Sequence, residues 1–321
     1  MSVLPGYDAL LQGGAWVRRS DRAIIRVAGA DRVSWLQGLV TNDVSALDPG
    51  QRIYSAYLTP QGRMITDLWV VATPDALLLD VPAPLAGSLA ARLDTLIFAE
   101  DIQIDDASAM MAVVQVFGAA TSTDATDAAT AGTDARMPGR IAIADRTFGV
   151  PSRVVYVPVP EVEAFIAALP GSPVEAGLDA LDVLRVEAGV PRFLVDMTEE
   201  TIPLEAGLED RAISFTKGCY VGQEIIVRVT TRGGGRVARR LVGLIVEGGA
   251  APPPPGAAIH AGERAVGRVT SAVFSPRRAG VIALGYVHRD FTEPGTRLEV
   301  HHDDRRDAAA VHALPFVPPQ P

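Results

Sequence analysis

Apolar and polar residues alternate along the first hundred positions in a way that predicts short strands and helices. Runs rich in apolar and β-branched residues predict strands at 23–27, 54–58, 63–71 and 77–79. The turn signal Thr59-Pro60-Gln61-Gly62 joins two of these strands into a β-hairpin. Apolar residues at helical spacing predict one helix near 31–40, with Asp31 as its N-cap, and a second near 85–96.

A similar mixture of elements follows in the middle of the chain. Strands are predicted at 113–117 and 153–157, and helices at 161–169 and 179–188. Because hairpins are frequent among these interspersed elements, we expect an α+β fold with antiparallel sheets rather than a doubly wound parallel sheet. Residues 118–139 are rich in Ala, Thr, Asp and Gly without an apolar period, so they predict a mobile surface insertion.

The pattern changes after the break at Thr231-Arg232-Gly233-Gly234-Gly235, which we interpret as a hinge. Beyond it the sequence predicts only short strands, separated by turns rich in Gly and Pro, at 240–246, 268–274, 281–287 and 297–301. That arrangement is typical of a small antiparallel barrel or sandwich. We therefore expect two domains, 1–235 and 236–321, with residues 315–321 as a frayed tail.

Composition narrows the classes of function. The 29 basic and 38 acidic residues give a net charge of −9, and aromatic residues make up only 6%, which argues against nucleic-acid binding. The single cysteine excludes an internal disulfide and fits a reducing cytoplasm. We find neither a signal peptide nor a run of ~20 apolar residues, so we expect no membrane association.

The densest group of chemically interesting residues lies at 217–224. The only cysteine, Cys219, follows Lys217 by two positions, in a stretch from Lys217 to Arg240 that carries a local charge of +5. Positive surroundings favour the thiolate form that makes a cysteine nucleophilic or metal-binding. Two plainer interpretations stay open, namely that Cys219 is a small buried apolar residue and that the basic stretch is a solvated linker.

Two carboxylates elsewhere are further candidates. Glu187 lies in the last turn of the helix predicted at 179–188, where the helix dipole disfavours an anion by ~0.3–1 kcal/mol. It could accept two N–H bonds from a flat heterocycle, or it could be an exposed residue paired with an arginine. Asp67 shares a strand face with Trp69, so it either lines a pocket, is buried with a partner, or faces water at a sheet edge.

The histidines are weaker candidates for a functional site. His301 and His302 precede two aspartates, but neighbouring residues on a strand point to opposite faces, so we expect no metal site there.

The stretch Lys217-Gly218-Cys219-Tyr220-Val221-Gly222-Gln223-Glu224 resembles the signature octapeptide of the YgfZ-type folate-binding proteins. These proteins are relatives of the glycine-cleavage T-protein, an aminomethyltransferase, and they assist iron–sulfur cluster assembly and repair. Supporting likenesses to the same family occur at 29–43, 58–63, 185–191, 202–205, 267–271 and 283–287.

The resemblance implies a fold and a site. It implies two similar α+β halves around a central folate cavity, closed by a C-terminal β-barrel. Glu187 would hold the pterin ring, Arg228 would meet the folate tail, and Tyr220 and Gln223 would be further cofactor contacts. Cys219, with Lys217 close by, would act as a thiolate at the mouth of the cavity. We therefore expect Glu187 and Cys219 to face the same cavity.

The resemblance also bears on the reaction. The T-protein has two consecutive acids in its first hairpin, whereas this chain has Thr66-Asp67, which argues against aminomethyl transfer. The leading hypothesis is a tetrahydrofolate-binding accessory factor for assembly or repair of 4Fe–4S enzymes, with iron–sulfur apoproteins or assembly factors as partners. The alternatives are a one-carbon transferase that uses Asp67 as its acid–base residue, and a folate-binding scaffold without chemistry.

Overall fold

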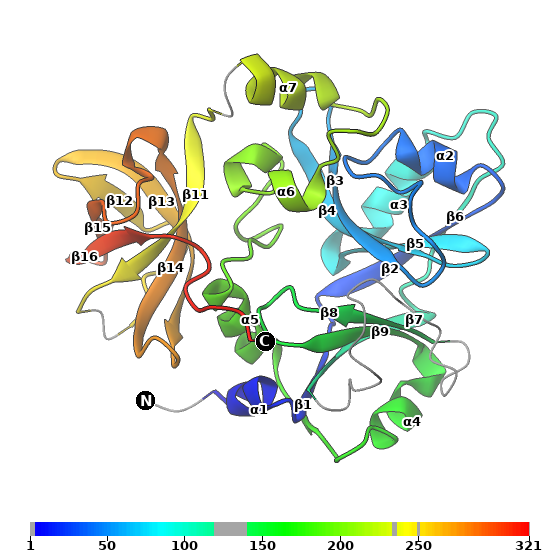
Figure 1. Ribbon diagram of the computed structural model, residues 1–321, viewed down its shortest axis with the longest axis horizontal. Coiled ribbons are helices and arrows are strands. Elements are labelled where there is room, and N and C mark those ends of the chain that lie inside the picture. Colours follow the sequence, from blue (N-terminus) through cyan, green and yellow to red (C-terminus); the bar gives the residue numbers. More distant parts are fainter. Residues whose placement is uncertain (1–3, 119–139, 233–235, 249–250, 321) are drawn as a thin grey trace.

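A computed structural model describes residues 4–118, 140–232, 236–248 and 251–320. These residues form two five-stranded sheets and a closed six-stranded barrel (Figure 1). Helices are interspersed with antiparallel strands, so the predicted α+β class is confirmed. No helix in the described part of the chain combines the length and apolar character needed to cross a membrane.

The first sheet has the strand order β3-β4-β5-β2-β6, and all its pairs are antiparallel. Its strands are β2 (Arg22–Ala28), β3 (Arg52–Leu58), β4 (Met64–Ala72), β5 (Ala76–Pro82) and β6 (Gln103–Asp106). Two helices, α2 (Arg32–Gln37) and α3 (Ala86–Asp94), bury their apolar side chains against one face of this sheet. Asp31 stands at the N-cap of α2 as predicted, but its carboxylate accepts from the backbone N–H of Asp101 rather than from the helix.

The second sheet has the order β10-β1-β7-β9-β8. Its strands are β1 (Ala15–Arg18), β7 (Met111–Phe117), β8 (Ile141–Asp145), β9 (Ser152–Pro158) and β10 (Val174–Glu175). Helix α4 (Val162–Ala167) packs on it through Phe165. The first strand of the chain, β1, therefore belongs to the sheet built mainly from later residues, where it pairs with β7 and, in parallel, with β10.

A short sequence repeat marks one local likeness between the two halves. Val81-Pro82-Ala83-Pro84 ends β5, and Val157-Pro158-Val159-Pro160 ends β9. In each case a 3₁₀ turn follows, at Ala83–Leu85 (η1) and Val159–Glu161 (η3), and leads directly into α3 or α4. Proline suits this position because the first turn of a helix leaves its N–H groups without partners.

The two sheets also pack against each other. Ile24, Val71 and Leu78 of the first sheet contact Val113, Val154 and Tyr156 of the second in one buried apolar cluster. Burial of these side chains holds the halves together, and the candidate site lies at the polar edge of this interface.

The barrel closes in the order β11-β14-β13-β12-β15-β16, as the sequence predicted for this region. Its strands are β11 (Arg239–Val246), β12 (Ala258–Ala261), β13 (Arg264–Ser275), β14 (Gly280–His288), β15 (Arg297–His302) and β16 (Arg305–His312), with a 3₁₀ turn, η6 (Arg289–Phe291), after β14. Gly267 allows β13 and β14 to approach closely, since a Cβ there would lie 2.0 Å from the carbonyl oxygen of Tyr286.

The remaining helices lie before or between these three parts (Figure 1). They are α1 (Tyr7–Gln12), α5 (Leu178–Glu187), η4 (Pro203–Ala206), α6 (Glu209–Ala212), α7 (Gln223–Val227) and a π-helix (η5, Arg228–Arg232). Helix α5 begins one residue earlier than predicted, with Gly177 as its N-cap, and it packs through Val186 on the barrel residues Leu241 and Ile282.

The prediction of a frayed C-terminal tail is wrong. Phe316 is only 2% exposed and packs on the barrel. The N–H groups of Phe316 and Val317 donate to the carbonyl oxygen of Glu187 at 2.9 and 3.3 Å, and that of Gln320 donates to Gly149 at 2.7 Å. The proline-rich sequence of this segment shows no periodic pattern from which these contacts could be predicted. The predicted insertion, apart from Gly118, and the glycines of the predicted hinge lie outside the described residues, and the domain boundary at 235 stays a prediction.

Candidate functional site

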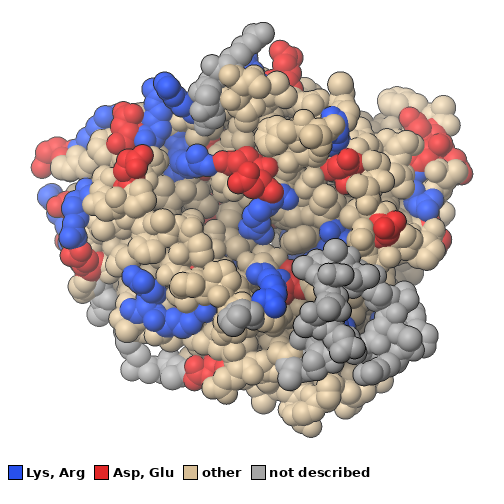
Figure 2. Space-filling view, in the orientation of Figure 1, with Lys and Arg blue, Asp and Glu red and all other residues tan. Residues whose placement is uncertain are grey.

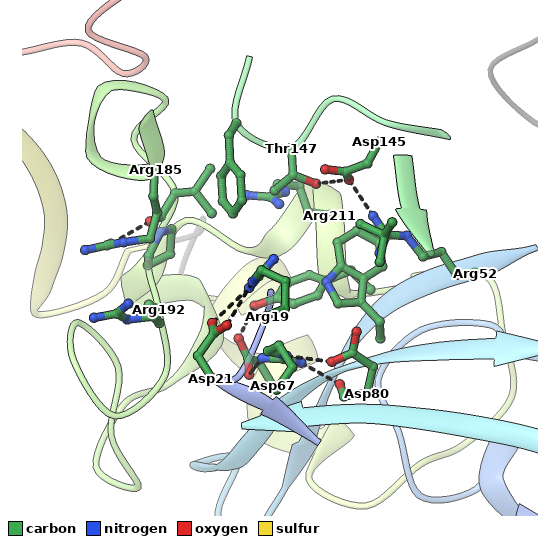
Figure 3. A pocket seen from close by; sticks show the side chains of 17 residues that line it. Arg19, Asp21, Arg52, Asp67, Asp80, Asp145, Thr147, Arg185, Arg192 and Arg211 are labelled. Atoms are coloured by element: carbon green, nitrogen blue, oxygen red, sulfur yellow. Dashed lines mark hydrogen bonds and ion pairs between the residues drawn. The ribbon is translucent and has the colours of Figure 1, made fainter. Parts of the chain in front are cut away.

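A small cavity lies where the edges of the two sheets meet residues 185–192 and α6. Its volume is about 70 Å³. Charged side chains of both signs surround it, as Figure 3 shows, and half of them come from strands of the two sheets. Such a concentration of charge away from water is costly unless each group finds a partner.

Asp67 of β4 is the sequence-predicted site residue that lines this cavity. Its side chain is buried, the whole residue being 4% exposed. Its Oδ2 accepts a hydrogen bond from the Tyr54 hydroxyl at 2.9 Å. Its Oδ1 lies 3.6 Å from Nη1 of Arg22, and among the described residues it has no hydrogen-bond partner. One acceptor oxygen of this buried carboxylate thus has no donor from the described part of the chain.

Arg22 and Asp80 join the cavity to the interface between the sheets. The Arg22 Nε donates to Asp80 Oδ1 at 2.6 Å, and the Tyr156 hydroxyl of the second sheet donates to Asp80 Oδ2 at 2.9 Å. Burial opposes the charge of Arg22, but Asp80 and Asp67 raise its pKa above the ordinary value, so it is a permanent cation. Burial, and then the neighbouring carboxylate, raise the pKa of Tyr156 and of Tyr54, so both hydroxyls stay protonated.

A second ion pair supports the aromatic wall of the cavity. The Arg52 guanidinium donates to Asp145 Oδ1 at 2.5 Å and lies 3.9 Å from the centre of the Trp69 ring. Tyr54 is paired with Trp69 across β3 and β4, with their rings 5.1 Å apart. Asp67 and Trp69 thus share one face of β4, as strand alternation predicts.

The rim of the cavity is basic. Arg19 is paired with Asp21 at 2.9 Å, Arg192 with Asp182 at 3.2 Å, and the Arg211 guanidinium lies 5.4 Å from the centre of the Tyr54 ring. Burial opposes ionisation of Asp21, but Arg19 outweighs it and lowers the pKa of that carboxyl. These arginines are scattered along the chain, and no local motif in the sequence marks them.

Glu187 does not reach this cavity. It is 0% exposed, and its carboxylate accepts from the Tyr7 hydroxyl at 2.8 and 2.9 Å, from Ser275 at 2.5 Å, and from Arg277 at 2.7 and 2.5 Å. It therefore ties α1 and the barrel strand β13 to the end of α5. Its acceptor capacity is filled by the protein itself, which leaves no free oxygen for a ligand.

Cys219 lies on the surface in the loop before α7, and its thiol is free. It does not line the cavity. The expectation that Glu187 and Cys219 face the same cavity is therefore wrong: one is sealed between α1 and the barrel, and the other is exposed to solvent.

Lys217 is a structural clamp in this structure. Its Nζ donates to the carbonyl oxygens of Gln37, Val40 and Asn42 at 2.7, 2.7 and 2.8 Å, at the end of α2 and in the loop after it. Burial lowers its pKa to about 8, so the ammonium keeps its charge at neutral pH. Lys217 is also the only lysine in the chain, where every other permanent cation is arginine. A compact ammonium can point three donors at three converging carbonyls, which a planar guanidinium cannot do.

The other predicted contacts in this region lie outside the cavity. Tyr220 is buried in a cluster with Leu58 and Met64. Gln223 begins α7, where its side-chain oxygen lies 3.4 Å from the backbone nitrogen of Tyr220. Arg228 is exposed at the end of α7. The octapeptide is thus packed on the first hairpin and on the loop after α2, and it presents Cys219 outward.

Comparisons with known proteins agree with this architecture. Residues 18–137 match the GCVT N-terminal domain, and residues 239–318 match the glycine cleavage T-protein C-terminal barrel domain. The crystal structure of the glycine cleavage system aminomethyltransferase T from Bartonella henselae superposes with a TM-score of 0.87 at 23% identity, over 99% of this chain and 90% of that chain.

Two curated relatives of this chain differ in the function that their names give. A probable aminomethyltransferase of Natronomonas pharaonis is 31% identical over 98% of this chain and 90% of its own length. An iron–sulfur cluster assembly factor IBA57 homolog of Mycosarcoma maydis is 30% identical over 70% of this chain, but the match spans only 55% of that protein. Both domain matches and the full-length relative point the same way: this chain belongs to the glycine-cleavage T-protein superfamily.

Proposed function

We propose that the chain binds a reduced folate, tetrahydrofolate or a one-carbon derivative of it, in the cavity at Asp67, and that it serves as an accessory factor in assembly or repair of 4Fe–4S enzymes. Membership of the T-protein superfamily supports the folate ligand. The likeness to an iron–sulfur cluster assembly factor and the octapeptide around Cys219 support the accessory role.

One observation carries the ligand proposal, namely the buried Oδ1 of Asp67 without a hydrogen-bond partner among the described residues. A pterin ring carries N–H donors along one edge, and a carboxylate oxygen with a free lone pair is their natural acceptor. Trp69 and Tyr54 supply aromatic surface beside it. The role that the sequence analysis gave to Glu187 passes to Asp67, because the Glu187 carboxylate is fully bonded within the protein.

The size of the cavity adds a requirement. A volume of about 70 Å³ accommodates several water molecules, whereas ligand sites commonly measure roughly 300–1,000 Å³. Entry of a folate therefore requires rim side chains such as Arg211 to move outward. The long, partly exposed arginines of the rim are suited to this, since their charges stay in water as they move.

The experiment is a calorimetric titration of tetrahydrofolate, kept reduced, into the wild-type protein and the Asp67→Asn variant. Hydrogen bonds to charged groups contribute about 1.5–3 kcal/mol, so we expect affinity to fall at least tenfold. Asp75→Asn is the matched control, because Asp75 lies in the turn between β4 and β5 and its side chain is 76% exposed. Equal affinity of wild type and Asp67→Asn would remove Asp67 from the site, and absence of binding by the wild type would overturn the folate proposal.

The accessory role is tested through Cys219. A thiolate is the form that attacks electrophiles or binds iron, and an exposed position makes the sulfur accessible to a partner protein. In cells that carry only the Cys219→Ser variant, we expect the activity of a 4Fe–4S enzyme to fall. Full activity would reject the thiolate role and favour a folate-binding scaffold. The scaffold also predicts that protein with fully alkylated Cys219 still functions.

A second candidate function is one-carbon transfer with Asp67 as the acid–base residue. The full-length match to a probable aminomethyltransferase favours it. Against it stands Thr66, at the position where the resemblance implies an acid; it is fully buried, and its hydroxyl donates to the backbone carbonyl of Asp67 at 2.9 Å. Steady-state turnover of an aminomethyl donor that disappears in Asp67→Asn would establish the transferase. If the wild-type protein shows no turnover, the transferase is rejected and the accessory role remains the proposed function.

A further inference from the structure

A chain of polar contacts leads from Asp67 to the other sheet. Nη1 of Arg22 lies 3.6 Å from Asp67 Oδ1, and Nε of Arg22 donates to Asp80 Oδ1 at 2.6 Å. At the far end of the chain, the hydroxyl of Tyr156 donates to Asp80 Oδ2 at 2.9 Å. Arg22, Asp67 and Asp80 lie on β2, β4 and β5 of the first sheet, whereas Tyr156 lies on β9 of the second. The position of the Asp67 carboxylate is therefore linked, through two residues, to the second sheet.

Tyr156 is a firmly held donor. It is 0% exposed and lies with Ile24 and Leu78 of the first sheet in the apolar cluster between the sheets. Its strand, β9, is hydrogen-bonded on both sides, to β7 and to β8. A side chain in so closely packed a site has little freedom to move its hydroxyl. Burial raises the pKa of that hydroxyl most and Asp80 adds to the effect, so the hydroxyl stays protonated and able to donate.

Tyr156 itself does not line the cavity, whereas Arg22, Asp67 and Asp80 do. Figure 2 shows acidic and basic side chains around the middle of one face, over the junction of the barrel with the two sheets. Charges at such a surface are screened by water and salt. The chain that ends at Asp67 is buried instead, since Asp80 is 2% exposed and the side chain of Arg22 is 10% exposed. With so little water nearby, each polar contact is stronger and the position of one group constrains the next.

The hydroxyl of Tyr156 determines how Asp80 binds Arg22. Tyr156 takes Oδ2 of Asp80, which leaves Oδ1 for Nε of Arg22. Without the hydroxyl, the Asp80 carboxylate is free to turn both oxygens toward Arg22, because a guanidinium favours bidentate pairing with a carboxylate. Arg22 would then be drawn toward Asp80 and away from Asp67, with which its contact is the longer one at 3.6 Å. Asp67 would lose the cation that holds its Oδ1.

We propose that Tyr156 is a positioning residue for the candidate site, and that it holds the Asp67 carboxylate in its binding orientation through Asp80 and Arg22. The inference rests on the proposed function, since it concerns how the proposed folate site is kept in shape. It gives a part in ligand binding to a residue that lies outside the cavity and in the other sheet. The packing of the two sheets thus sets the geometry of the site as well as the stability of the fold.

The experiment is a double-mutant cycle in which tetrahydrofolate, kept reduced, is titrated into the wild type, Tyr156→Phe, Asp67→Asn and the double variant. Tyr156→Phe should weaken binding roughly fivefold in the wild type but less than about twofold in Asp67→Asn, because the carboxylate through which Tyr156 acts is then absent. A merely structural role would give the same loss in both backgrounds. Tyr7→Phe is the matched control, because it also removes a buried hydroxyl that donates to a carboxylate, that of Glu187, away from the cavity. It should leave the affinity unchanged.

Urea denaturation of the two Tyr→Phe variants separates lost stability from lost binding. If Tyr156→Phe folds poorly, Asp80→Asn takes its place in the cycle with the same expectation, since it withdraws the charge that holds Arg22. Unchanged affinity in Tyr156→Phe, or an equal loss in both backgrounds, would overturn the positioning role while the folate site stands. If the wild type binds no tetrahydrofolate, or Asp67→Asn binds it as tightly as the wild type does, the proposed site itself fails and the positioning role with it.

Discussion

The Nζ of Lys217 lies 2.7 Å from the carbonyl oxygen of Val40, 177 residues earlier in the chain. With two further carbonyls, this contact fastens the octapeptide to the loop that follows α2. Backbone contacts run beside it, since Ser214 N–H donates to the Thr41 carbonyl and Val221 N–H to that of Gly38. The position of Cys219 is therefore set by an ammonium group and not by the local backbone alone.

Replacement of Lys217 tests this clamp. Lys217→Met leaves three partly buried carbonyls without their donor, so we expect the free energy of unfolding to fall by about 1–3 kcal/mol. Lys217→Arg keeps the charge but should recover little of the lost stability, because the N–H groups of a planar guanidinium cannot donate to three converging carbonyls at once. Urea denaturation followed by circular dichroism measures both. An arginine variant as stable as the wild type would contradict the geometric explanation.

Glu187 is expected to matter for stability and not for ligand binding. Glu187→Gln leaves Arg277 without its counter-ion in a site where the carboxylate is 0% exposed, and breaking such a pair costs about 3–5 kcal/mol. Thermal unfolding should therefore occur at a lower temperature, while the folded variant binds tetrahydrofolate as the wild type does. Weakened binding by a fully folded variant would return Glu187 to the ligand site.

Phe316 is expected to anchor the C-terminal segment. Removal of a buried Phe side chain costs about 3–5 kcal/mol, so Phe316→Ala should lower the free energy of unfolding by a similar amount. Exposed Phe98 provides the control, because Phe98→Ala removes the same atoms from a residue that is 86% exposed. Limited proteolysis adds a second measurement: cleavage near residue 315 should become faster only in Phe316→Ala. Identical behaviour of both variants would mean that the tail is not docked in solution.

The thiol of Cys219 should react without unfolding. Because it is exposed and is the only cysteine, a thiol reagent should modify one group per native chain at nearly the rate seen in denaturant. Alkylation should leave tetrahydrofolate affinity unchanged, since Cys219 does not line the cavity. Protection of the thiol in the native protein, or its protection by added folate, would place the sulfur nearer the ligand than this structure does.

The sequence predicted what local patterns determine. Alternating residues and turn signals located the first hairpin and most of the barrel, and the placement of Asp67 beside Trp69 on one face follows from strand periodicity. The sequence also indicates that Glu187 occupies an unusual position for an acid, at the end of a helix. It does not indicate that Arg277 is the partner of Glu187, because Arg277 lies 90 residues further along the chain, in the barrel.

The rest depends on contacts between distant segments. The charges around the cavity come from β2, β3, β4, β5 and β8 and from segments outside the strands. Only the packing of the two sheets brings Asp80 to Tyr156 and Arg52 to Asp145. The tail was predicted to be frayed because a proline-rich run shows no periodicity, although Phe316 fills a space made by α5 and the barrel. Local spacing predicts Lys217 as a companion of Cys219, whereas its three acceptors, between Gln37 and Asn42, lie 175 to 180 residues earlier in the chain.

The placement of β1 has a consequence for synthesis on the ribosome. This strand emerges among the first residues, yet both of its neighbours, β7 and β10, are translated later, and β10 follows by more than a hundred residues. Until then its two edges stay open to incorrect partners, including other nascent chains. A truncated gene that stops between the sheets would encode a fragment with an orphan strand, so dissection of this protein should begin with β2 or extend through β10.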